Sequence, residues 1–110
     1  MGVASVGSVL LVKFPYSDLS SYKNRPAIVV AKAEFNNLVL CQITSQKISS
    51  KMAVNLNSPQ DFDVGKLPLS SFIRTDKIFT ADSSLIVREL GKVSDTKLQE
   101  VRSQIRKLFE

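Results

Sequence analysis

The chain has 110 residues and a mass of 12.2 kDa, enough for one domain (residues 1–110) with a modest core and too little for a second. Hydrophobic residues make up 44% and charged residues 23%, proportions typical of a globular protein and not of a disordered or membrane-embedded one. Histidine is absent, which excludes Ser-His-Asp and Cys-His catalysis and histidine metal sites, and the single cysteine, Cys41, excludes an internal disulfide and a cysteine-based zinc site. The formal net charge of +5 favours polyanionic partners.

The apolar runs are short. The longest, Val9–Val12 and Pro26–Ala31, fall far below the ~20 residues that span a membrane. Residues 1–5 lack the basic region and the long apolar stretch of a secretory signal. We therefore expect a cytoplasmic protein without membrane contacts.

Strand-like segments occupy most of the chain. They are rich in Val, Ile and Leu and are separated by Ser, Asn, Asp, Gly and Pro, which is typical of all-β domains. The connections are too short for helical crossovers, so we expect a mainly antiparallel sheet. The predicted strands are Val9–Phe14, Pro26–Ala31, Leu38–Ile43, Met52–Leu56, Leu67–Ile73 and Leu85–Leu90.

The last segment has the period of a helix. From Ser94 onward, apolar residues recur every three or four positions, and Ser94 itself is a good N-cap. This predicts a helix from Asp95 to Phe109 that closes or caps a small, coiled antiparallel barrel. The apolar positions are Leu98, Val101, Ile105 and Leu108.

Arg25 is the first candidate for a functional side chain. It follows a polar loop, residues 15–24, and precedes Pro26, which favours an extended backbone at Arg25. A guanidinium fixed at the end of a strand is suited to binding a phosphate through two hydrogen bonds. The alternative is a surface salt bridge, for example with Asp18.

Thr44 is the second candidate, at the end of the third predicted strand. Alternation places Gln42 and Thr44 on one side of that strand and Cys41, a small buried hydrophobe, on the other. A turn centred on Glu34-Phe35 pairs Arg25 with Thr44, whereas a turn at Asn36-Asn37 pairs Arg25 with Ile48. An ordinary strand threonine is the alternative for Thr44.

Two other polar segments carry charged groups. In Phe72–Lys77, Arg74 and Lys77 would add positive charge to a phosphate-binding track, or Arg74 would form a structural pair with Asp76. The carboxylates of Asp61–Asp63 make a poor metal site, so we expect a solvated loop there and no metal.

These segments occur in a characteristic order. Gly7–Pro15 leads to Lys23–Val30, followed by Gln42–Gln46, Phe72–Lys77 and the C-terminal amphipathic segment. In this order and spacing, the chain resembles the PemK/MazF family of toxins from bacterial toxin–antitoxin pairs, from about Gly7 to Phe109. Ser8 departs from the pattern, because relatives often have Asp at that position.

The resemblance implies an SH3-like barrel with a C-terminal helix, the MazF/CcdB-like toxin fold, working as a homodimer. It also implies sequence-selective cleavage of single-stranded RNA without metal or cofactor. The family's catalytic pair corresponds to Arg25 and Thr44. RNA contacts are expected from the first loop, from the residues after the threonine and from the segment Phe72–Lys77. The expected contact residues are Tyr16, Lys23, Ser45, Gln46, Lys47, Arg74 and Lys77.

Such cleavage uses the 2′-hydroxyl of the RNA as nucleophile, so the protein needs to supply only positioning, charge stabilisation and help with proton transfer. The expected products are a 2′,3′-cyclic phosphate and a 5′-hydroxyl. We expect Arg25 to stabilise the phosphorane electrostatically, because a guanidinium is almost never neutral at pH 7.

Partners follow from the charge and the resemblance. We expect an acidic, partly disordered antitoxin encoded nearby, a second copy of the chain, and operator DNA reached through the antitoxin complex. One alternative is a catalytically silent barrel that binds only nucleic acid or the antitoxin. Another is a CcdB-type gyrase poison, although those toxins share a functional tryptophan and this chain has none.

Overall fold

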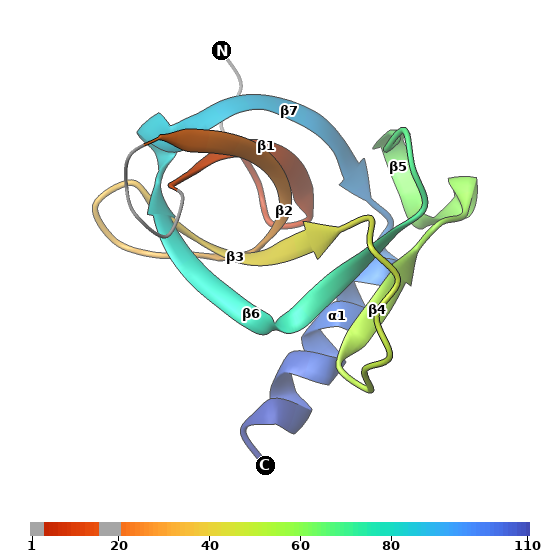
Figure 1. Ribbon diagram of the computed structural model, residues 1–110. Helices are drawn as coiled ribbons and strands as arrows, with labels where there is room; N and C mark the ends of the chain where they lie inside the picture. Colours follow the sequence, from red (N-terminus) through yellow and green to blue (C-terminus); the bar gives the residue numbers. More distant parts are fainter. Residues whose placement is uncertain (1–3, 16–20) are drawn as a thin grey trace.

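A computed structural model describes residues 4–15 and 21–110. In this part of the chain, the strands form one sheet in the order β4-β6-β3-β2-β1-β7-β5, and every neighbouring pair is antiparallel (Figure 1). The strands are β1 Ser8–Pro15, β2 Tyr22–Lys32, β3 Asn37–Thr44, β4 Ala53–Leu56, β5 Phe62–Gly65, β6 Ser71–Asp82 and β7 Ile86–Val93. Two short 3-10 helices, η1 Pro59–Asp61 and η2 Ser83–Leu85, and the helix α1, Asp95–Leu108, complete the fold.

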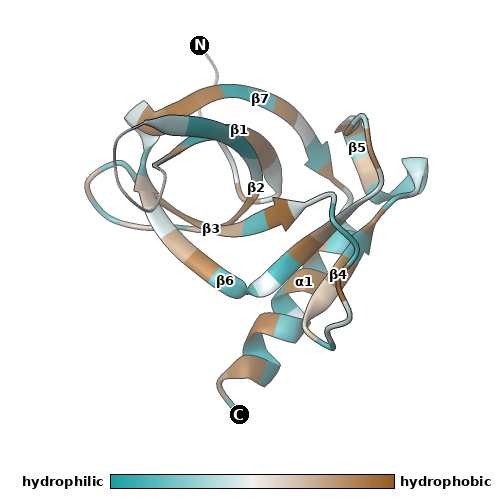
Figure 2. Ribbon diagram, viewed as in Figure 1, coloured by the Kyte–Doolittle hydropathy of each residue, from teal (hydrophilic) through white to brown (hydrophobic). Residues whose placement is uncertain are grey.

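The sheet curls into a partial barrel, and α1 packs against its outside (Figure 1). The predicted small antiparallel barrel with a C-terminal helix is thus confirmed. Apolar and hydrophilic residues alternate along β6 and α1 (Figure 2), as expected where one side of an element is buried.

Two hydrophobic clusters lie on the two sides of the sheet. One joins the sheet to α1 and includes Ile43, Ile73 and Val101. The other lies on the opposite side and includes Val12, Ala27 and further apolar residues from β1, β2 and β3. Because the chain alternates sides in a strand, neighbouring residues of β1, β2 and β3 contribute to different clusters.

The helix begins as the sequence predicts. The Ser94 side chain accepts a hydrogen bond from the Lys97 amide at 3.2 Å, and Leu98 and Val101 are buried against the sheet. α1 ends at Leu108, one residue before the predicted end. No helix in the described residues is long and apolar enough to cross a membrane.

Three strand predictions were incomplete. β2 begins at Tyr22, inside the segment predicted as a polar loop, because its pairing with β1 extends to Pro15. β5, Phe62–Gly65, was missed because its alternation is too short to distinguish it from a loop. β6 begins later than predicted and continues past Ile73 to Asp82, because its pairing with β3 extends through Arg74 and, after a bulge over residues 75–77, resumes at Ile78.

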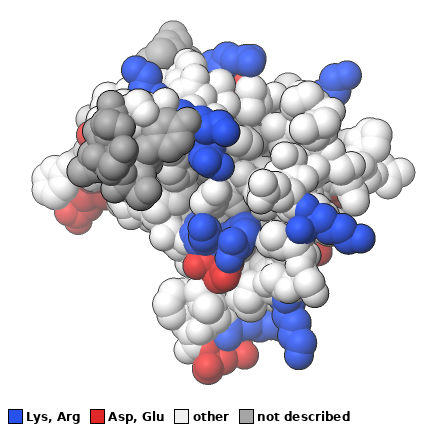
Figure 3. All heavy atoms as spheres, viewed as in Figure 1, with Lys and Arg blue, Asp and Glu red and all other residues white. Residues whose placement is uncertain are grey.

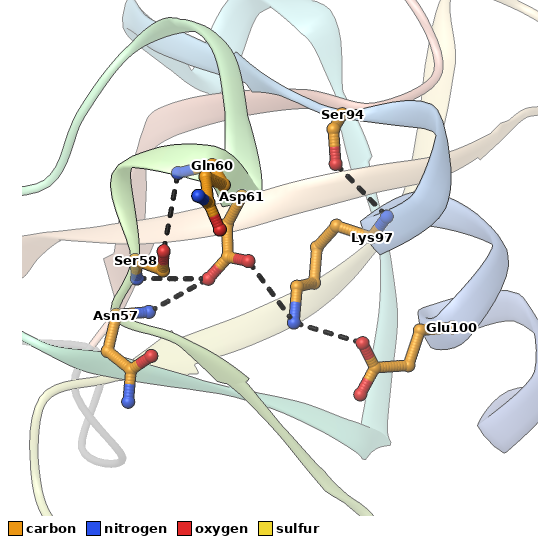
Figure 4. Close-up of polar contacts among 7 residues, drawn as sticks. All are labelled: Asn57, Ser58, Gln60, Asp61, Ser94, Lys97 and Glu100. Atoms are coloured by element: carbon orange, nitrogen blue, oxygen red, sulfur yellow. Dashed lines mark hydrogen bonds and ion pairs between the residues drawn. The ribbon is translucent and has the colours of Figure 1, made fainter.

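The expectation of a solvated loop at Asp61 was wrong. Its carboxylate accepts hydrogen bonds from the backbone amides of Asn57 and Ser58, each at 3.1 Å, and caps η1 (Figure 4). It also lies 3.6 Å from the ammonium of Lys97, which is buried and forms a second ion pair with Glu100 at 3.0 Å. This cluster ties η1 to the first turns of α1.

Candidate active site

Arg25 lies in the central strand β2, opposite Val12 of β1. Its side chain is half-buried, and the strand becomes fully buried two residues later, at Ala27. Cross-strand partners share a side of the sheet, so Arg25 stands at the open end of the cluster that contains Val12 and Ala27.

The ladder between β2 and β3 shows which residue lies beside Arg25. Ala27 faces Gln42 and Ile28 faces Cys41. Continuing this register by two residues brings Arg25 across from Thr44, on the same side of the sheet. Between Ala27 and Val29 the ladder therefore has the register whose continuation places Arg25 across from Thr44, and not the one that leads to Ile48.

The turn that produces this register differs from the predicted one. The amide of Ala33 donates to the carbonyl of Asn37, which closes a loop centred on Phe35. Phe35 and Asn36 have φ values of 60° and 63°, a left-handed conformation that is uncommon for phenylalanine. A shift in register between Val29 and Ala31 then restores the alignment farther along the hairpin.

A row of side chains extends from Thr44 across the sheet. Thr44 faces Phe72 of β6, which in turn faces Asn55 of β4. One step along, Gln42 faces Arg74. All lie on the side of the sheet opposite α1, because Ile43, between Gln42 and Thr44, is buried in the cluster that includes the helix.

The Thr44 hydroxyl has one internal partner among the described residues. Its oxygen accepts a hydrogen bond from the Gln46 amide at 3.1 Å. A hydroxyl that accepts in this way keeps its proton for donation. Thr44 can therefore donate to an oxygen of a bound anion.

Arg74 and Asp76 form the pair that the sequence left open. Nε and one terminal nitrogen of Arg74 lie 3.3 and 3.1 Å from the two carboxylate oxygens of Asp76. The hydrogen bond from Arg74 lowers the pKa of Asp76 below its ordinary value, and the positive charge of Arg74 lowers it further. Part of the charge of Arg74 is thus neutralised locally, while its remaining N–H groups stay available.

The other predicted contact residues that the structure describes lie in exposed positions. Lys23 precedes Arg25 on the same strand, and Lys77 follows the Arg74–Asp76 pair. Tyr16, and Asp18 as a partner for Arg25, lie outside the described residues. Lys and Arg side chains spread over the face seen in Figure 3, with fewer acidic groups between them. The segment after Thr44 is exposed at Ser45, Gln46 and Lys47.

The chain is similar to known proteins. The family model for PemK-like, MazF-like toxins of type II toxin-antitoxin systems matches residues 5–109. The chain belongs to this family. No curated protein sequence matches it.

Solved structures show the same fold for this MazF-like toxin at low sequence identity. MazF from Deinococcus radiodurans is 23% identical with a TM-score of 0.77, over 99% of this chain and 98% of that one. The chain matches a MazE-MazF structure from the same organism at 20% identity and a TM-score of 0.80, over 99% and 97% of the two chains. An endoribonuclease in complex with its cognate antitoxin, from a mycobacterial species, is 17% identical with a TM-score of 0.75, over 96% and 95%.

Sequence reasoning missed two residues of the toxin's candidate site, Phe72 and Asn55. Both share the row with Thr44, but their strands are far from β3 in sequence, so only the pairing of β6 with β3 and β4 reveals it. The alternation of β4, with Val54 buried and Asn55 exposed, was the available signal.

Cys41 is buried as predicted, and burial raises the pKa of its thiol to about 12. The thiol is therefore neutral at physiological pH and is not a nucleophile. Among the described residues, no three His, Cys, Asp or Glu side chains come together in an arrangement that could hold a metal ion.

Proposed function

We propose that this toxin is a metal-independent, sequence-selective endoribonuclease that cleaves single-stranded RNA, with Arg25 and Thr44 as its catalytic residues. The observation that carries the proposal is the register of β2 and β3 at Ala27–Gln42, whose continuation by two residues puts Arg25 opposite Thr44. Membership of the MazF-like family and the fold shared with a mycobacterial endoribonuclease support it.

The reaction needs no nucleophile from the protein. The 2′-oxygen of the RNA forms a bond to the adjacent phosphorus while the bond from phosphorus to the 5′-oxygen breaks. The 2′-hydroxyl loses its proton and the leaving 5′-oxygen gains one, so the products end in a 2′,3′-cyclic phosphate and a 5′-hydroxyl. The chain must hold the scissile phosphate and stabilise the charge that builds up on its oxygens.

Arg25 and Thr44 have the chemistry for these tasks. The guanidinium of Arg25 carries a permanent charge and can bind two phosphate oxygens in a bidentate manner. The Thr44 hydroxyl, with its oxygen already accepting from the Gln46 amide, donates to a non-bridging oxygen. Cross-strand neighbours lie about 5 Å apart, so one phosphate can contact both side chains.

The flanking nucleotides are assigned to the polar surface around this pair. The proposed RNA contacts are Tyr16 from the segment before β2, Lys23 on β2, Ser45, Gln46 and Lys47 after Thr44, and Arg74 and Lys77 on β6. Arg74 is paired with Asp76, whereas Lys23, Lys47 and Lys77 have no ion pair with a described residue. We therefore expect Arg74 to contribute less to RNA affinity than the lysines do.

Incubation with a long single-stranded RNA, with and without EDTA, tests the proposal. We expect discrete fragments in both conditions, with 2′,3′-cyclic phosphate and 5′-hydroxyl ends at the cut sites. Loss of cleavage in EDTA with recovery in Mg²⁺, or fragments with 5′-phosphate ends, would contradict it. Complete inactivity of the folded protein would favour the catalytically silent binding barrel.

An acidic antitoxin that covers the basic site is the proposed inhibitor, and the cytoplasm, where RNA substrates lie, is the proposed compartment. Structural neighbours of this fold are complexes with MazE or with a cognate antitoxin. Charge complementarity favours such a partner for a chain of net charge +5. Co-expression with a small acidic protein encoded beside this gene should abolish cleavage, and cleavage that persists would contradict the pairing.

The homodimer is proposed to form beside α1. A groove of about 440 Å³ lies between this helix and β2, β3 and β6, and Phe109 at its edge is 77% exposed. Apolar side chains line most of the groove, including Val39, Ile78 and Ile105. Sedimentation equilibrium should give about twice 12.2 kDa, and Ile105→Glu should give a monomer. A wild-type monomer that cleaves RNA at full rate would contradict the dimer.

A further inference from the structure

β6 has an irregularity directly after Arg74, beside the candidate site. Arg74 pairs with Gln42, but the next residue of β3, Cys41, pairs with Ile78. The residues between, 75–77, have no partner on β3 and bulge out of the ladder. Bulges of this kind often lie next to functional sites, where they redirect side chains.

Within the bulge, Thr75 points inward. It is fully buried, at 0% exposure, whereas Asp76 and Lys77 are exposed. Its hydroxyl donates a hydrogen bond to the carbonyl oxygen of Met52, and its backbone amide donates to the same oxygen at 3.3 Å. One carbonyl therefore accepts both donors of Thr75.

Met52 is the residue at which the loop after Thr44 ends. β4 begins at the next residue, Ala53. The other end of the loop is tied by the hydrogen bond from the Gln46 amide to the Thr44 hydroxyl. The segment Ser45–Lys51 is thus held at both ends, at one by the candidate catalytic threonine and at the other by Thr75.

We infer that Thr75 is a positioning residue whose buried hydroxyl holds the segment Ser45–Lys51 in place for RNA binding. This inference rests on the proposed function, because that segment is a proposed RNA contact. A loop that is ordered before binding does not lose its conformational entropy when RNA binds, so its contacts contribute more to affinity. Thr75 contacts neither the RNA nor the reacting atoms and acts through the loop.

Two substitutions separate the hydroxyl from the bulk of the side chain. Thr75→Val keeps the β-branched shape and removes the donor, whereas Thr75→Ser keeps the donor and removes a methyl group. We expect Thr75→Val to raise KM for a single-stranded RNA about fivefold with little change in kcat, the factor expected for loss of one buried hydrogen bond. Thr75→Val should also relax the preference among cleavage sites in a long RNA. Thr75→Ser should keep its KM and its preference among sites within about twofold of wild type.

Limited trypsin digestion tests the anchoring of the segment without a measurement of RNA cleavage. Lys47 and Lys51 lie in the held segment, and Lys66 is an exposed lysine in a different loop that serves as an internal control. We expect faster cleavage after Lys47 and Lys51 in Thr75→Val only, with cleavage after Lys66 unchanged. If the wild-type protein does not cleave RNA and Thr75→Val is still digested faster after Lys47 and Lys51, the proposed function is refuted and the anchoring stands.

Three results would overturn the inference. The first is a Thr75→Val protein with wild-type digestion at Lys47 and Lys51. The second is an equal effect of both substitutions at all three lysines, which would mean that Thr75 only fills space. The third is altered digestion with unchanged KM and cleavage pattern in an active enzyme, which would separate loop order from RNA binding.

Discussion

The polar cluster around Asp61 and the polar row around Arg25 and Thr44 use similar residue types in opposite ways. At Asp61 the carboxylate and the ammonium of Lys97 find their partners inside the protein, and both groups are largely buried. At the ends of β2 and β3, Arg25 is half-buried and has no ion pair or side-chain hydrogen bond with another described residue. Internally satisfied groups stabilise a fold, whereas oriented groups with unused donors are available to a ligand.

Replacing Arg25 should give the largest effect, and the effect should be on catalysis. Arg25→Ala removes the charge assigned to the phosphorane, so we expect kcat to fall by about 10²- to 10³-fold. The free energy of unfolding should change by less than about 1 kcal/mol, because the side chain lies at the edge of the core. Single-turnover cleavage of RNA and urea unfolding measure the two quantities.

Arg88→Ala is the matched control, because Arg88 is an exposed arginine on β7 and its loss changes the net charge equally. We expect its kcat to stay within about twofold of wild type. Equal losses in both variants would mean that overall charge, and not the position of Arg25, drives cleavage.

Replacing Asp61 should lower stability and leave catalysis unchanged, the opposite of replacing Arg25. Asp61→Ala removes one half of the capping box of η1 and leaves Lys97 buried with Glu100 as its remaining partner, so we expect the free energy of unfolding to fall by about 2–3 kcal/mol. The folded fraction should retain its kcat. Asp63→Ala, an exposed carboxylate two residues away, should change stability by less than about 0.5 kcal/mol. A loss of kcat larger than the loss of folded protein would contradict a purely structural role for Asp61.

The smallest effect concerns acid stability at the Arg74–Asp76 pair. Because the folded pKa of Asp76 lies below the value of the unfolded chain, the unfolded state binds the proton first as the pH falls. The stabilisation is complete above the ordinary pKa near 3.8 and is lost as the pH falls through the folded value. Asp76→Asn should be less stable than wild type at pH 7, and the gap should close below about pH 4. Urea midpoints from pH 7 to pH 3 measure it, and a constant gap would refute the assignment.

Local patterns in the sequence were sufficient for most of the elements, though not for β5, and they marked Arg25 and Thr44 as candidate functional residues. The Ser94 cap and the apolar positions of α1 depend on neighbouring residues, so the helix start was predicted correctly. The register at Ala27–Val29, whose continuation pairs Arg25 with Thr44, was also one of the two predicted, although it arises from a loop centred on Phe35 and a register shift near Val30 that compensate for each other. A propensity argument cannot foresee such a compensation, because left-handed phenylalanine is rare.

Long-range contacts account for what the sequence did not reveal. Asp61 was assigned to solvent because its partner, Lys97, lies on α1, far along the chain. The anchoring role of Thr75 was invisible for the same reason, since its acceptor, the carbonyl of Met52, belongs to another strand connection. In both cases a polar residue between apolar segments has a buried partner that only the assembled sheet supplies.

The most direct test of the central claim, that Arg25 and Thr44 act together on one phosphate, is a double-mutant cycle. Single-turnover cleavage rates would be measured for wild type, Arg25→Ala, Thr44→Ala and the double variant, all shown to be folded. Residues that act as a unit are strongly non-additive, so the account predicts that the double variant is barely slower than Arg25→Ala alone. Losses that multiply, as they do for independent sites, would contradict it.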